Sequence, residues 1–148
     1  MKIIAKNKQA SHLYFLHDRF EAGIVLSGTE IKSIRAGKVN IKDSFVRIKN
    51  GEAFLVNMHI GRYTEGNQFN HDETRERKLL LHKNEIIKLD TKKSQDNFTI
   101  VPTLVYLERG LAKVEIALAK GKKLFDKRRS LKEKDVKRRM EKEFHGRH

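Results

Sequence analysis

Phe45-Val46-Arg47-Ile48-Lys49-Asn50-Gly51-Glu52-Ala53-Phe54-Leu55-Val56 is the stretch that decides the fold. Two apolar-rich runs flank the pair Asn50-Gly51. Asn-Gly readily takes up the positive φ angles of a two-residue type I′ turn. The stretch therefore predicts two antiparallel strands joined by a tight turn.

A second hairpin is predicted from residues 98–108 to residues 111–119, with Arg109-Gly110 as its turn. Its second strand alternates apolar and polar positions, and this period of two gives one buried and one solvated face. The expected buried residues are Val114, Ile116 and Leu118.

Two further features complete the predicted strands. An apolar-rich run at residues 14–26 is expected to begin the sheet. Pro102 interrupts the strand at residues 98–108. Because proline cannot donate a ladder hydrogen bond, we expect an edge position or a bulge there.

Two short helices are predicted between the strands. Ser27-Gly28-Thr29-Glu30 has the spacing of a capping box, in which Ser27 and Glu30 satisfy free backbone N–H groups, and Gly37 can close this helix. The second helix is expected at about residues 83–93, with Ile86, Leu89 and Ile87 facing inward.

These elements predict a mainly β protein with short helices, of the α+β class. Regularly spaced short strands favour a small antiparallel β-barrel of the oligonucleotide-binding type, and a Greek-key sandwich is the alternative. The chain has 148 residues, which suits one folded domain.

Charge divides the chain into two parts. The whole carries 33 Lys and Arg against 19 Asp and Glu, and residues 120–148 hold 13 and 5 of these. We predict an RNA-binding β-barrel domain at residues 1–119 and a basic tail at residues 120–148. The tail has too few apolar residues to fold alone, so we expect it to be disordered by itself and helical when bound.

The excess of positive charge indicates a polyanionic partner, with nucleic acid first and an anionic membrane surface second. The chain has no cysteine, which excludes disulfides and thiolate metal sites and agrees with a cytoplasmic protein. No apolar run reaches the ~20 residues of a membrane span.

Several strings, in this order and spacing, resemble one family. They include Phe20-Glu21-Ala22-Gly23, Gly28-Thr29-Glu30-Ile31-Lys32-Ser33, Arg77-Lys78-Leu79-Leu80-Leu81-His82 and Ala119-Lys120-Gly121-Lys122-Lys123. Over about residues 7–143 the chain is similar to small protein B, also called SsrA-binding protein. The resemblance implies a non-enzymatic factor of trans-translation with no cofactor.

Further expectations come from the same resemblance. Members bind the tRNA-like domain of tmRNA and deliver alanyl-tmRNA, carried by elongation factor Tu, to stalled ribosomes. The tail then enters the vacant decoding site, lined by 16S rRNA, and the mRNA channel, so that the peptide is tagged and the ribosome released. We expect a monomer.

The tmRNA-binding residues are expected on the exposed face of the barrel and on the first helix. On residues 77–82 as a strand, positions 78, 80 and 82 share one face, where lysine can meet phosphate and the other two can pack on a sugar or base. From pattern alone, Leu80 suits the core equally well. The predicted set is Glu21, Lys32, Arg35, Lys38, Arg77, Lys78, Leu80 and His82.

The second predicted set acts at the decoding site through the tail. Basic side chains suit rRNA phosphates, and Phe125 can stack on a base. The set is Lys122, Lys123, Phe125, Asp126, Lys127, Arg128, Lys132, Lys134, Lys137, Arg138 and Arg139.

Two other functional classes are alternatives for this sequence. A ribosomal or general RNA-binding protein fits the composition equally well, and only the ordered strings disfavour it. A nuclease would need a convergent acid–base cluster, which the spacing does not supply. His71-Asp72-Glu73 lacks a second cluster at ligand spacing, so no metal site is predicted.

Overall fold

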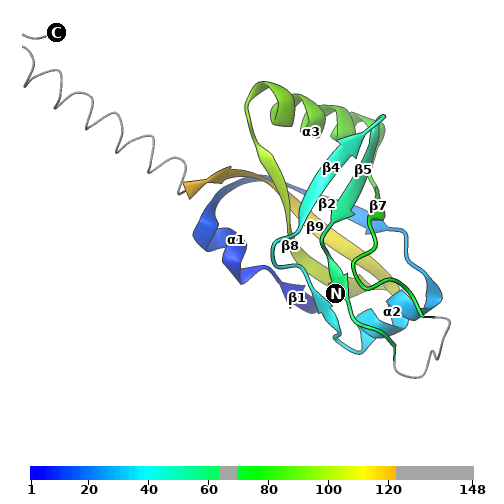
Figure 1. Cartoon of the computed structure of the whole chain (residues 1–148). Coiled ribbons are helices and arrows are strands. Elements are labelled where there is room, and N and C mark those ends of the chain that lie inside the picture. The colour runs from blue at the N-terminus through cyan, green and yellow to red at the C-terminus, as the bar shows by residue number, and fades with distance from the viewer. Residues whose placement is uncertain (64–69, 123–148) are drawn as a thin grey trace, which may run out of the picture.

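The computed structural model describes residues 1–63 and 70–122 of the chain. These residues form nine strands and three helices (Figure 1). In chain order they are β1 (Lys2–Lys6), α1 (Lys8–Leu13), β2 (Tyr14–Ile24), α2 (Gly28–Arg35), β3 (Val39–Asn40), β4 (Phe45–Lys49), β5 (Glu52–Val56), β6 (His59–Ile60), β7 (Arg77–Leu80), α3 (Lys83–Gln95), β8 (Thr99–Glu108) and β9 (Leu111–Gly121).

Both predicted hairpins are present. β4 pairs with β5 through Asn50 and Gly51, whose φ angles of 53° and 75° are those of a primed turn. β8 pairs with β9 through Arg109 and Gly110, with φ angles of 50° and 79°. The turn residues therefore fix where the chain reverses, and the strand registers follow from them.

Seven strands form one curved antiparallel sheet in the order β1-β8-β9-β2-β7-β5-β4, and β3 pairs with β6 in a small second sheet. The α+β class is confirmed. The barrel is not closed, because in the described part of the chain β1 pairs only with β8 and β4 pairs only with β5. One large curved sheet also differs from the two facing sheets of a sandwich.

Several details differ from the sequence predictions. β1 and the short helix α1 were not predicted, and β1 is an exposed edge strand whose sequence has no strict alternation. Pro102 lies at a register shift, as one alternative expected, but β8 is an interior strand between β1 and β9. Ile87 is 55% exposed and does not face the core.

The core fills the concave side of the sheet. It joins side chains of the sheet to Ile34 of α2 and Leu89 of α3, both fully buried. The predicted inward residues Val114, Ile116 and Leu118 all belong to it. α2 and α3 therefore pack at opposite ends of the same sheet, as Figure 1 shows. Within the described ranges no helix is long and apolar enough to cross a bilayer.

Candidate nucleic-acid interface

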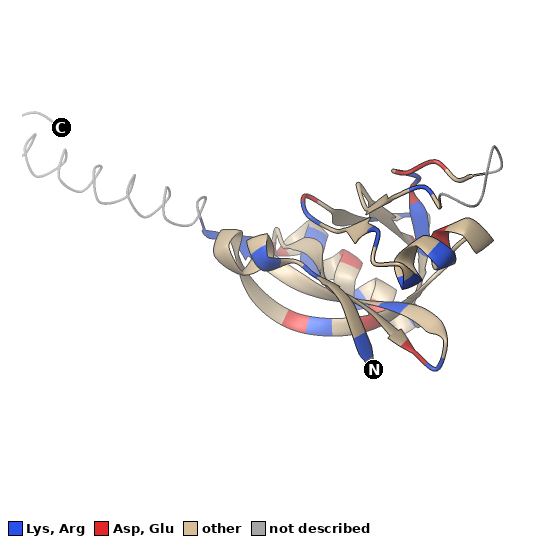
Figure 2. Cartoon of the chain, turned by 90° about the horizontal axis from the view of Figure 1, so that it is seen from below, with Lys and Arg blue, Asp and Glu red and all other residues tan. Residues whose placement is uncertain are grey.

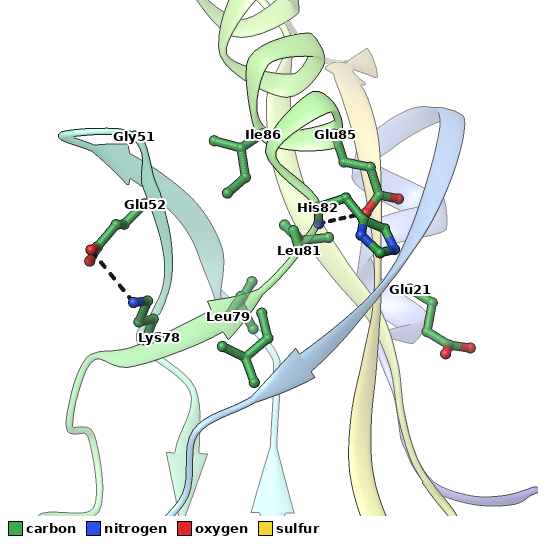
Figure 3. Close-up of a pocket in the computed structure, with 10 residues that line it drawn as sticks. Glu21, Gly51, Glu52, Lys78, Leu79, Leu81, His82, Glu85 and Ile86 are labelled. Atoms are coloured by element: carbon green, nitrogen blue, oxygen red, sulfur yellow. Dashed lines mark hydrogen bonds and ion pairs between the residues drawn. The ribbon is translucent and has the colours of Figure 1, made fainter.

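A hollow of about 440 Å³ lies between the start of α3, β7, β2 and the β4–β5 turn (Figure 3). The side of the hollow is formed by the outward positions of β7 and by the first residues of α3. Four residues predicted to bind RNA line it: Glu21, Lys78, Leu80 and His82. The fold thus brings together side chains that lie up to 61 positions apart in the sequence.

Lys78 is the cation of this hollow. Its ammonium lies 3.5 Å from a carboxylate oxygen of Glu52, and both side chains are about half exposed. Figure 3 shows the two side chains facing each other across the strands. An exposed pair of this kind contributes little to stability, so a phosphate can replace Glu52 as the partner of Lys78 at small cost.

Leu80 is the apolar surface of the hollow. Strand alternation buries Leu79 completely and leaves Leu80 54% exposed. Leu80 pairs across the ladder with Gly23 of β2, where an added Cβ would lie 3.2 Å from the Cβ of Leu80. Gly23 therefore leaves Leu80 room beside β2. The alternative that Leu80 belongs to the core is wrong.

His82 lines the hollow, but it does not lie on the strand on which it was predicted. β7 ends at Leu80, and His82 is the N-cap residue of α3, so it does not continue the strand face. Its backbone N–H donates to the Glu85 carboxylate at 3.0 Å, as Figure 3 shows. The helix start, rather than strand alternation, positions this imidazole.

Glu21 is held by two neighbours on the sheet. Lys113 Nζ donates to its Oε1 at 2.7 Å, and the Tyr106 hydroxyl donates to its Oε2. These contacts, that of Lys113 first, lower the pKa of Glu21 below its ordinary value. Burial and the contact with Glu21 raise the pKa of Tyr106. Glu21 therefore holds the partly exposed Lys113 and the hydroxyl of the buried Tyr106 in place.

Lys113 and Tyr106 were not among the predicted site residues. The only available signal was the strand alternation that places Lys113 on the solvated face. The register that brings Lys113 opposite Gly23, two pairs from Glu21 and on the same face of the sheet, became visible only with the β2–β9 ladder.

Arg77 differs from its prediction. It has no exposed surface, and its Nε donates to the Glu30 carboxylate of α2. Its other nitrogens donate to three backbone carbonyl oxygens, at 2.6 Å from Met58, 3.3 Å from Asp72 and 3.2 Å from Glu73. A direct contact with RNA, as expected from its neighbours in sequence, does not fit this position. Arg77 instead ties β7 to α2 and to the chain around it.

Glu30 completes this buried cluster. Burial alone would raise its pKa, but hydrogen bonds from Arg75, from the Ser27 backbone N–H and from Arg77 outweigh that effect and lower the pKa to about 2. Ser27 and Glu30 form the predicted capping box, so the same carboxylate starts α2 and neutralises Arg77.

The three basic residues near α2 lie away from the hollow. Lys32 lies 5.4 Å from the ring centre of Tyr63, Arg35 donates to the Gly110 carbonyl at 3.5 Å, and Lys38 packs beside Gly61. All three are exposed. They form a second basic region, at the opposite end of the sheet from α3 (Figure 1).

Of the predicted tail residues, only Lys122 falls within the described residues. It donates to the Ser11 carbonyl at 2.8 Å and lies 5.2 Å from the ring centre of Phe15. The start of the tail is thereby attached to α1. Lys123, Phe125 and the other tail residues named above lie outside the described residues, as do the predicted tail helix and its disorder.

The histidine and carboxylate side chains of the described residues do not form a metal centre. Among residues 1–63 and 70–122, no three such side chains are grouped to hold an ion. His71 instead bridges the Thr29 hydroxyl, at 2.9 Å, and the Ile60 carbonyl, at 2.8 Å. It is a buried structural histidine.

A curved antiparallel sheet with an exposed lysine, leucine and histidine at one hollow defines a small RNA-binding protein of the oligonucleotide-binding type. The chain belongs to the SmpB protein family, whose model matches residues 4–146.

Curated relatives are similar over nearly their whole length. The chain is 61% identical to an SsrA-binding protein of Shouchella clausii, over 95% of this chain and 90% of the relative. It is 58% identical to an SsrA-binding protein of Caldanaerobacter subterraneus subsp. tengcongensis, over 97% and 91%. A solved structure reported as "tmRNA-SmpB: a journey to the center of the bacterial ribosome" matches with a TM-score of 0.68 and 48% identity. That match covers 80% of this chain and 83% of the other.

Proposed function

We propose that this protein binds tmRNA and acts with it in trans-translation on the ribosome. Membership of the SmpB family supports this role, together with the relatives named as SsrA-binding proteins. The RNA target within tmRNA is its tRNA-like domain, and the protein acts in the cytoplasm, where stalled ribosomes occur.

The observation that carries the proposed interface is the convergence of Lys78, Leu80 and His82 on one exposed hollow. Lysine neutralises a phosphate, and an exposed leucine beside an imidazole gives a surface on which a sugar or unpaired base can pack. Glu21 contributes by holding Lys113 and Tyr106 rather than by facing phosphate itself.

The basic residues near α2 extend this interface. Lys32, Arg35 and Lys38 are exposed at the other end of the sheet, where they can neutralise phosphates of the same structured RNA. A large RNA can touch both ends of a small domain, whereas a short oligonucleotide cannot. We therefore assign these three residues to affinity rather than to base recognition.

The division into residues 1–119 and 120–148 is part of the proposal. The first part binds tmRNA, and the basic tail, from Lys122 through Arg139, enters the vacant decoding site and mRNA channel. The attachment of Lys122 to α1 supports this by giving the tail a fixed origin on the folded domain. We also propose a monomer that meets elongation factor Tu within the alanyl-tmRNA complex.

A non-enzymatic role completes the proposal. Glu21, one of the carboxylates that line the hollow, has both oxygens engaged by Lys113 and Tyr106 and a lowered pKa, which makes it a poor proton carrier at neutral pH.

The test is a comparison of labelled RNAs with the full chain. A discrete complex with tmRNA, uncleaved RNA and a clear preference over tRNA and rRNA fragments of similar size support the proposal. Equal affinity for every structured RNA indicates a general RNA-binding protein, and cleavage indicates a nuclease.

A second arm tests the tail. A chain that ends at Lys123 is expected to keep its tmRNA affinity and to lose peptide tagging in a reconstituted translation reaction. Loss of affinity together with tagging contradicts the division of labour between the two parts.

A further inference from the structure

Two adjoining hollows lie on the α1 side of the molecule and share Asn7 and Gln9 in their walls. The larger, about 430 Å³, is lined by the lysines Lys6, Lys8 and Lys42. The smaller, about 230 Å³, has aromatic and acidic walls. Their residues do not line the hollow between β7 and α3.

Asn7 builds the partition between the two hollows. Its Nδ2 donates to the Pro102 carbonyl at 2.9 Å and to the Ile41 carbonyl at 3.4 Å, and its Oδ1 accepts from the Ala10 N–H at 3.1 Å. These bonds join the start of α1 to β8 and to the loop before β4. The two hollows are therefore held in a fixed arrangement by side-chain to backbone bonds.

The larger hollow suits a phosphate group. Lys6, Lys8 and Lys42 are all exposed, and none of the ion pairs in residues 1–63 and 70–122 involves them. Three lysines without a carboxylate partner on one hollow repel one another, and a phosphate relieves that repulsion.

The smaller hollow suits a planar base. Tyr14 and Phe45 are half-buried at its wall, and Val101 is buried beneath. Its volume is several times the ≈30 Å³ that one water occupies in the liquid. Aromatic side chains in such a position give stacking surfaces for an unstacked nucleobase.

Asp43 supplies the smaller hollow with a carboxylate that can accept hydrogen bonds. It adopts φ +61°, and its carboxylate makes no hydrogen bond or ion pair with the described part of the chain. A carboxylate accepts from two donors side by side, which guanine presents at N1–H and N2–H. The Gln9 amide, on the shared wall, can donate to the guanine O6.

We propose that these two hollows together bind one unstacked guanosine nucleotide of an RNA, with its phosphate at the lysines and its base between Tyr14 and Phe45, facing Asp43. This contact is separate from the interface proposed above and goes beyond it. Lys8, Gln9 and Ala10 of α1 line the hollows, and Lys122 bonds to the Ser11 carbonyl of the same helix. Figure 2 shows Lys and Arg in blue at this end of the molecule.

The test uses the full chain labelled with ¹⁵N and the trinucleotides UGU, UAU and UIU, in which inosine lacks the N2 amino group. UGU is expected to shift the backbone signals of residues 6–14 and 40–45 and to bind more tightly than UAU and UIU. Equal binding of all three, or shifts confined to residues 78–86, overturns the proposal.

Matched variants sharpen the test. Asp43→Asn keeps a side chain that tolerates positive φ but removes the pair of carboxylate acceptors. The variant is expected to bind UGU roughly tenfold more weakly than the wild-type chain does, with little change in its affinity for UAU. Lys2→Gln, on the edge strand β1 and outside all three hollows, should leave UGU binding unchanged. The tmRNA affinity of Lys78→Gln is a separate measurement, so failure of the tmRNA proposal is distinguishable from failure of this one. Free GMP binding as tightly as UGU would assign the site to a free nucleotide and overturn the RNA contact.

Discussion

Glu30 of α2 and Arg77 of β7 form an ion pair in which neither side chain has any exposed surface. The two residues are 47 positions apart. Arg77 also donates to the carbonyl oxygens of Met58, Asp72 and Glu73, so one guanidinium joins a helix, a strand and two loops. Because Lys78 follows Arg77 in β7, this cluster also holds the strand that carries the proposed RNA-binding face.

Breaking this pair is expected to destabilise the fold strongly. Glu30→Gln leaves Arg77 as a buried charge without its carboxylate partner, which costs about 3–5 kcal/mol. Arg77→Met is expected to cost less, because Arg75 still pairs with Glu30 at 2.6 Å. Urea unfolding measures the loss. Arg47→Gln removes a similar pair with Glu76 at the surface and should cost under about 1 kcal/mol. Equal effects of the buried and exposed substitutions contradict the account of the cluster.

The same cluster predicts a loss of stability in acid. The pKa of Glu30 is about 2 in the folded protein against 4.5 for the ordinary carboxyl. Because the folded state has the lower pKa, the contribution is present above pH 4.5 and is lost as the pH falls towards 2.

The expected contribution of Glu30 is on the order of 3 kcal/mol. Unfolding free energies at pH 6 and pH 3, compared between the wild-type chain and Glu30→Gln, isolate it. The wild-type chain should lose more stability than the variant over this interval. An identical loss in both would show that Glu30 does not titrate with a lowered pKa.

Leu80 and Leu79 are neighbours that should respond in opposite ways. Leu80→Ala removes an exposed side chain, so we expect a stability change under about 1 kcal/mol and roughly tenfold weaker tmRNA binding. Leu79→Ala opens a cavity in the core and should cost about 2–5 kcal/mol. Thermal unfolding and a mobility-shift titration provide the two readouts. Unchanged RNA affinity in Leu80→Ala would remove this residue from the interface.

Glu21 should act through its neighbours. Glu21→Gln keeps its shape but loses the charge that holds Lys113, so RNA affinity should fall by a modest factor and Lys113→Met should produce a similar fall. The double variant should then lose little more than either single variant, since both remove the same interaction. Additive losses would show that the two residues contact RNA independently.

The sequence predicted the elements that depend on local chemistry. The turns at Asn50-Gly51 and Arg109-Gly110 and the capping box at Ser27 are local signals, and all three are present. The alternation in β9 holds from Leu111 to Ile116, but Ala117, predicted on the solvated face, is fully buried. β1 was not predicted, because an exposed edge strand shows little alternation of apolar and polar residues. The sequence also could not predict that the barrel stays open, because closure depends on whether the two edge strands, β1 and β4, pair with each other.

The proposed site brings together four of the predicted residues, but its geometry was not predictable from the sequence. The resemblance brought out Glu21, Lys78, Leu80 and His82, and the fold places all four at one hollow. Alternation alone would have put Arg77 on the core face, opposite to Lys78, and its burial follows that rule. The partners of Glu21 depend on the β2–β9 register, which no short-range pattern determines.

The most direct test of the proposed RNA-binding face is the affinity of the tRNA-like domain of tmRNA for Lys78→Gln and for Lys2→Gln, measured over a range of salt concentrations. Each variant removes one exposed lysine, and Lys2 lies on the edge strand β1, away from the hollow. Lys78→Gln should weaken binding and lower the log–log salt slope by roughly 0.9, whereas Lys2→Gln should leave both unchanged. Equal effects of the two variants, or no effect of Lys78→Gln, would contradict the assignment of this face to tmRNA.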